Sequence, residues 1–91
     1  MRLVTFLRLG EPRIGAVVGE QVIDLNAGYQ YLQERAGIPR PRERAAVVLP
    51  PDMAGFLTNG EEALSAARNV VEHVGKTESA TLAGKGILYG L

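Results

Sequence analysis

The sequence contains no cysteine and only one histidine, His73, in 91 residues. The missing cysteine excludes a disulfide framework, a thiol nucleophile and a thiolate metal site. A single histidine without a second histidine or a cysteine is a poor metal site. His73 lies near the expected end of a helix, where an imidazolium interacts favourably with the helix dipole, so a structural role is the simpler interpretation.

The sequence also lacks an excess of charge of either sign. Ten lysines and arginines balance ten aspartates and glutamates. No apolar run approaches the roughly 18 residues typical of a membrane span. We therefore expect a cytoplasmic protein with no nucleic-acid partner and no membrane partner.

What is present is enough apolar sequence for one core. Hydrophobic residues make up 46% of the chain. A domain of this size buries somewhat over roughly 60% of its unfolded surface, which allows one core with little to spare. We expect one α+β domain over residues 1–91, with a small antiparallel sheet packed against two or three helices.

The first 25 residues predict an antiparallel meander. β-formers and alternation indicate three strands, with a tight turn at Gly19-Glu20. Gly15 and Gly19 fall on the same face and leave room for close packing there. The expected strands are residues 2–8, 13–19 and 21–25, with a further apolar strand at 86–91.

Helical periodicity begins after the meander. We predict helices over residues 27–36, 53–58 and 60–74. Asn26 is the expected N-cap of the first helix and Asp52 of the second. For the third, Asn59 and Glu62 resemble a capping box. Pro41 followed by residues 42–49 fits a short helix, and the apolar run 45–49 fits either that helix or a buried strand. Residues 76–86 are expected to be an irregular connector.

Three arginines, Arg40, Arg42 and Arg44, form the one shift in composition. A guanidinium can bind a phosphate or a carboxylate through two parallel hydrogen bonds. The segment also fits a solvated linker whose charge is partly offset by Glu34 and Glu43. No aromatic residue is interleaved, which favours the linker, and the role of the three arginines stays open.

The remaining polar residues do not form a recognisable catalytic pattern. Glu61 and Glu62 are neighbours on a helix and point about 100° apart, which does not suit a shared metal ion. Tyr29, Tyr31 and Tyr89 fit a pocket lining or, more simply, core packing. Apart from His73, no base is placed to activate the hydroxyls of Thr5, Thr58, Ser65, Ser79 and Thr81. We therefore expect no catalytic, cofactor-binding or metal-binding residue in this chain.

The order of three segments resembles the start of fumarylacetoacetate hydrolase family proteins. A first strand at 2–6 precedes an Arg-x-Gly-x-Val-x-Gly strand at 13–19 and a Val-x-Asp-Leu segment at 22–25. Pro51-Asp52-Met53, followed by Phe56, Leu57, Gly60 and an alanine-rich helix, is similar to a second landmark of that family.

The resemblance implies that this is the N-terminal domain of a larger enzyme. Family members use magnesium, calcium or manganese to hydrolyse, decarboxylate or isomerise small oxo-acids. Their metal ligands and their histidine–glutamate pair lie in a later catalytic domain, which is absent from residues 1–91. On this view the chain is cut from a longer protein, is catalytically inert alone, and contacts the catalytic domain or a second copy of itself. The alternatives are a free-standing interaction or scaffold module and, least favoured, an independent enzyme.

Overall fold

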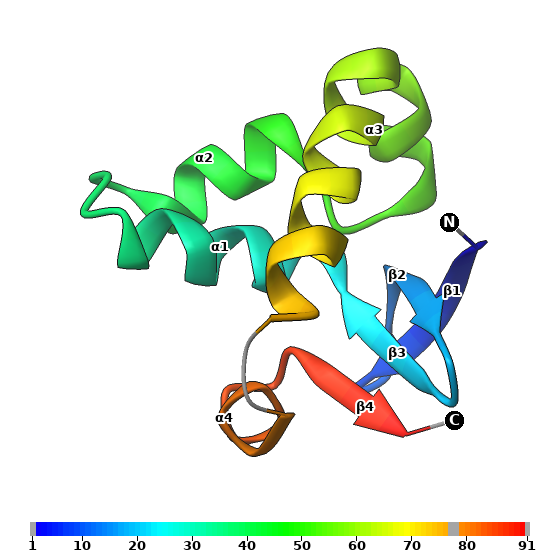
Figure 1. The fold of residues 1–91 in the computed structure, drawn as a ribbon. Helices are drawn as coiled ribbons and strands as arrows, with labels where there is room; N and C mark the ends of the chain where they lie inside the picture. The colour runs from blue at the N-terminus through cyan, green and yellow to red at the C-terminus, as the bar shows by residue number, and fades with distance from the viewer. Residues whose placement is uncertain (1, 77–78, 91) are drawn as a thin grey trace.

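The computed structural model describes residues 2–76 and 79–90, which form an α+β fold (Figure 1). In this part of the chain an antiparallel sheet with strand order β1-β2-β3-β4 packs against four helices. The elements are β1 (Arg2–Arg8), β2 (Glu11–Val18), β3 (Gln21–Asp24), α1 (Leu25–Arg35), α2 (Pro41–Val48), α3 (Met53–Val74), α4 (Ser79–Gly84) and β4 (Leu88–Gly90).

The predicted meander and last strand are confirmed, with shifted ends. β2 starts at Glu11, two residues earlier than predicted, because the turn before it is confined to Leu9 and Gly10, which both have positive φ. β4 adds to the outer side of β3, where Ile23 pairs with Leu88. Leu91, which the predicted strand included, lies outside the described residues.

Three predictions about the helices need correction or completion. α1 begins at Leu25, directly after β3, and its N-cap is Asp24 rather than Asn26. The undecided segment 45–49 is helical as far as Val48, with Leu49 as the C-cap, and Pro41 is the first residue of α2. The expected connector contains the helix α4, which has little apolar sequence but buries Leu82 to 1% exposure.

The two predicted helices at 53–58 and 60–74 form one element, α3, with a break at Gly60. Gly60 has φ 56° and ψ −125°, a conformation that glycine adopts more easily than other residues. Asp52 caps the first part as predicted. The predicted capping box is wrong, because the Asn59 side chain donates hydrogen bonds to the carbonyls of Val47 and Val48 and so closes the end of α2.

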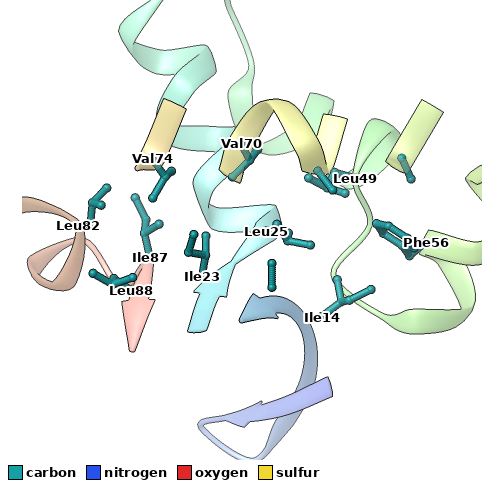
Figure 2. Packing of buried hydrophobic residues seen from close by; sticks show 13 residues of the cluster. Ile14, Ile23, Leu25, Leu49, Phe56, Val70, Val74, Leu82, Ile87 and Leu88 are labelled. Atoms are coloured by element: carbon teal, nitrogen blue, oxygen red, sulfur yellow. The ribbon is translucent and has the colours of Figure 1, made fainter. Parts of the chain in front are cut away.

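The core lies between the helices and one face of the sheet (Figure 2). Ala16, Ile23 and Leu88 occupy paired positions on neighbouring strands and therefore share that face. α3 packs closely on α1 at Gly28, where a Cβ atom would lie 2.6 Å from Val70 Cγ1. The members of the cluster are Ile14, Ala16, Ile23, Leu25, Leu49, Phe56, Ala63, Ala67, Val70, Val74, Leu82, Ile87 and Leu88.

The opposite face of the sheet carries a small aromatic cluster. The rings of Phe6 and Tyr89 lie 5.5 Å apart and, with their neighbours, leave Val22 only 6% exposed. Gly15 makes this possible, because a Cβ atom there would lie 2.9 Å from Phe6 Cε1 and 2.7 Å from Val22 Cγ1. Within residues 2–76 and 79–90, no helix combines the length and apolarity needed to cross a membrane.

Candidate functional site

Among the described residues, Asp24 is the centre of the most connected polar group. It is the last residue of β3 and the N-cap of α1, and it is fully buried. Its backbone N–H donates to the carbonyl of Ile87, and its Oδ1 accepts from the N–H of Ala27 at 3.1 Å. Because no loop separates β3 from α1, Asp24 is both the last residue of the strand and the N-cap of the helix.

Two arginines from the first hairpin neutralise this buried carboxylate. Arg13 donates from Nε to Asp24 Oδ2 at 2.6 Å and from Nη2 to Oδ1 at 3.1 Å, a two-pronged pair. Arg8 lies farther away, with Nη1 at 3.5 Å from Oδ2. The Arg13 side chain is 16% exposed and that of Arg8 35%, so Arg13 is the main partner.

The network continues into α1 through Asn26. Its Oδ1 accepts from Arg13 Nη2 at 3.2 Å and from Gln30 Nε2 at 2.9 Å, while its Nδ2 donates to the carbonyl of Leu49 at 2.9 Å. Asn26 therefore connects the hairpin, α1 and the residue after α2. In the described part of the chain every buried side-chain nitrogen and oxygen has a hydrogen-bond partner, as expected of a well-ordered polar cluster.

This cluster forms one wall of a partly open cleft of about 670 Å³. The cleft lies between α1, α2 and the segment that leads from α4 into β4. Its lining residues are Arg8, Arg13, Asn26, Ala27, Gln30, Tyr31, Glu34, Arg42, Ala46, Pro51, Lys85 and Ile87. Lys85 Nζ sits 5.8 Å from the centre of the Tyr31 ring, a cation–π distance.

The cleft is positively charged although the chain as a whole is neutral. Four cations, those of Arg8, Arg13, Arg42 and Lys85, line it. Two carboxylates oppose them, Glu34 in the lining and Asp24 behind Arg13, so two positive charges remain in excess. Such an arrangement attracts anions.

The three arginines noted in the sequence have different positions. Arg42 lines the cleft, whereas Arg40 and Arg44 border a shallow hollow on another side of α2. The segment is not an irregular linker, because Arg42 and Arg44 belong to the helix α2. Of the three tyrosines, Tyr31 lines the cleft, while Tyr29 packs against the core and Tyr89 against Phe6.

Within the described part of the chain, the other polar residues are not brought together into a reactive group. His73 is exposed near the end of α3, where its Nδ1 lies 2.9 Å from the carbonyl oxygen of Asn69. Glu61 and Glu62 are exposed on the same helix. Across residues 2–76 and 79–90, no three histidine or acidic side chains are grouped in a way that would hold a metal ion.

The sequence contains a signal for the Asp24 cluster that the motif analysis did not use. The hairpin register places Asp24 opposite Gly15, so Arg13 is its diagonal neighbour on the same face. Gly15 offers no side chain that would separate the two. The contributions of Lys85 and Arg42 have no comparable local signal, because they depend on how the helices pack.

Comparison of the chain with protein-family models, curated proteins and solved structures found no match.

Proposed function

We propose that residues 1–91 are the non-catalytic N-terminal domain of a metal-dependent enzyme of the fumarylacetoacetate hydrolase type. The observation that carries the proposal is the role of the motif residues. Arg13 and Asp24, which lie in the two motif strands, form the partly buried ion pair at 2.6 Å. Gly15 provides the close packing beneath Phe6. The motif residues therefore stabilise the fold and do not form a reactive group, which is the role expected in a supporting domain.

In this proposal the chemistry belongs to a later, catalytic domain of a cytoplasmic protein. That domain supplies the divalent metal and hydrolyses, decarboxylates or isomerises a small oxo-acid. The described residues of this chain offer no suitable metal-binding group, so no metal ligand is assigned here. The role of residues 1–91 is to support or partly cover the catalytic domain.

Exposed apolar side chains at one end of the sheet support a contact with that domain. Leu7 is 72% exposed and Leu9, in the β1–β2 turn, is 97% exposed. Isolated from a partner, such a surface favours association between copies. We expect size-exclusion chromatography to show self-association of residues 1–91 at high concentration, and a Leu7→Ser, Leu9→Ser variant to remain monomeric.

The decisive test is to read the gene beyond the codon for Leu91. A continuing frame that encodes His-x-x-Glu and Glu-x-Glu segments supports the proposal. A stop codon overturns it and favours a free-standing interaction module. As an independent check, purified residues 1–91 with magnesium should give no turnover of an acylpyruvate, and measurable turnover would contradict the inert role.

A further inference from the structure

We propose that the cleft between α1, α2 and residues 85–87 is a binding site for a small organic dianion, specifically a dicarboxylate. The proposal concerns this chain's own residues and does not depend on the family assignment.

The first argument is that most of the positive charge lacks a strong protein partner. Asp24 accepts two hydrogen bonds from Arg13 and only a long one, at 3.5 Å, from Arg8. Among the described residues, Arg42 and Lys85 form no ion pair. Like charges around one cleft repel each other, and a bound anion relieves that repulsion. Because two charges are in excess, a dianion neutralises the site.

The second argument is that two of the cations, Lys85 and Arg8, are held in place without a strong ion pair. The cation–π contact with Tyr31 positions Lys85 but leaves its ammonium charge uncompensated. The guanidinium of Arg8 packs against the backbone at Gly86, where a Cβ atom would lie 2.7 Å from Nη2. Side chains that are already ordered lose less conformational entropy when a ligand binds.

The third argument concerns the shape of the ligand. Between the cations the lining is mixed, with apolar contacts from Ala27, Ala46, Pro51 and Ile87 beside the polar groups of Asn26, Gln30 and Glu34. A short hydrocarbon chain can contact the apolar residues while its two ends reach different cations, Arg42 from α2 and Lys85 or Arg8 from the sheet side. Inorganic phosphate, which has no carbon body, gains nothing from that surface. The mixed lining is typical of sites for small organic molecules.

The test is a titration of residues 1–91 with succinate, followed by two-dimensional NMR at low ionic strength. We expect saturable shifts at Ala27, Gln30 and Lys85. Arg42→Ala should weaken succinate binding at least tenfold. Arg42 is a suitable position because its side chain forms no hydrogen bond or ion pair in the described structure, so its loss should leave the fold intact.

Arg44→Ala is the matched control. Arg44 is also an exposed arginine of α2, two residues along, but it lies outside the cleft. The Arg44→Ala variant should bind succinate with unchanged affinity. Succinamide, a neutral analogue of the same length, should not bind.

Three results would overturn the proposal. Equal weakening by Arg42→Ala and Arg44→Ala would indicate general attraction to a basic surface. Shifts that do not saturate would show that no defined site exists. Tighter binding of inorganic phosphate than of succinate would reject the dicarboxylate class.

Discussion

Two aspartates, Asp24 and Asp52, are the N-caps of helices in this protein. Each accepts a hydrogen bond from a backbone N–H in the first turn of its helix, but they differ in burial and in charged partners. Asp24 Oδ1 accepts from the N–H of Ala27 at 3.1 Å, and Asp52 Oδ2 accepts from the N–H of Gly55 at 2.9 Å. Asp52 is exposed, with no charged partner in the described structure. Asp24 is fully buried and faces two arginines.

The comparison shows that the importance of a residue depends on which elements meet at it. Asp52 satisfies one amide at the start of α3, which is a local task. Asp24 contacts β2 through Arg13, the residue before β4 through the carbonyl of Ile87, and α1 through its cap. A carboxylate removed from water needs such partners, since burial of an unpaired charge is strongly unfavourable.

The sharpest way to test this contrast is to remove each carboxylate. We expect Asp24→Ala to lower the free energy of unfolding by about 3–5 kcal/mol, because it leaves Arg13 without its partner and α1 without its cap. Asp52→Ala should lower it by about 1 kcal/mol, the ordinary cost of a lost N-cap. Urea denaturation followed by circular dichroism measures both.

A third variant separates charge from cap at the same position. Asp24→Asn keeps an oxygen that can accept from Ala27 but removes the charge, and it is the variant to use where Asp24→Ala does not fold. We expect Asp24→Asn to lower the free energy of unfolding by less than Asp24→Ala and by more than Asp52→Ala. Equal losses for Asp24→Ala and Asp52→Ala would show that the ion pair adds nothing to stability.

The next test compares the two arginines that reach Asp24. Arg13→Ala should cost about 2–3 kcal/mol, since it removes two hydrogen bonds to a buried carboxylate. Arg8→Ala should cost less than about 1 kcal/mol, because its contact is 3.5 Å long and its side chain is more exposed. The same denaturation experiment applies, and a larger loss for Arg8→Ala would reverse the assignment of the main partner.

The last test concerns the strand that positions Arg13. Gly15→Ala would place a methyl group 2.7 Å from Val22 Cγ1 and 2.9 Å from the carbonyl oxygen of Ile23. We expect a loss of about 1–3 kcal/mol from overpacking. Gly84→Ala is the control, since no atom lies within 4 Å of the added group, and it should leave the melting temperature unchanged or raise it. An unchanged stability of the Gly15→Ala variant would show that the sheet accommodates the methyl group without a loss of free energy.

The predictions from sequence succeeded where the signal was local. The apolar face of α3, carried by Ala63, Ala67, Val70 and Val74, is buried as its periodicity predicts. Asp52 was recognised as a cap because it directly precedes the helix. The Asn26 prediction is wrong because the strand ends at Asp24 and the helix begins directly at Leu25, which makes Asp24 the residue before the helix. α4 was missed because its six residues have a single large apolar side chain, Leu82.

The candidate cleft is a different case, because no segment of the sequence contains it. Its lining comes from β1, β2, α1, α2 and the approach to β4. Arg42 and Arg44 lie two residues apart in α2 and therefore point to different sides of the helix, but only the packing of α2 beside α1 makes the Arg42 side part of the cleft. Lys85 had no neighbours in sequence that marked it as part of a site.

The sequence by itself determined the α+β class, the meander and the apolar face of α3, since alternation, helical periodicity and turn residues act over a few neighbours. The tertiary structure decided which charges meet. Asp24 became the centre of a buried network, and Arg42 and Lys85 became cleft residues, because ion pairing and burial depend on distances between side chains that the chain brings together only when its core forms.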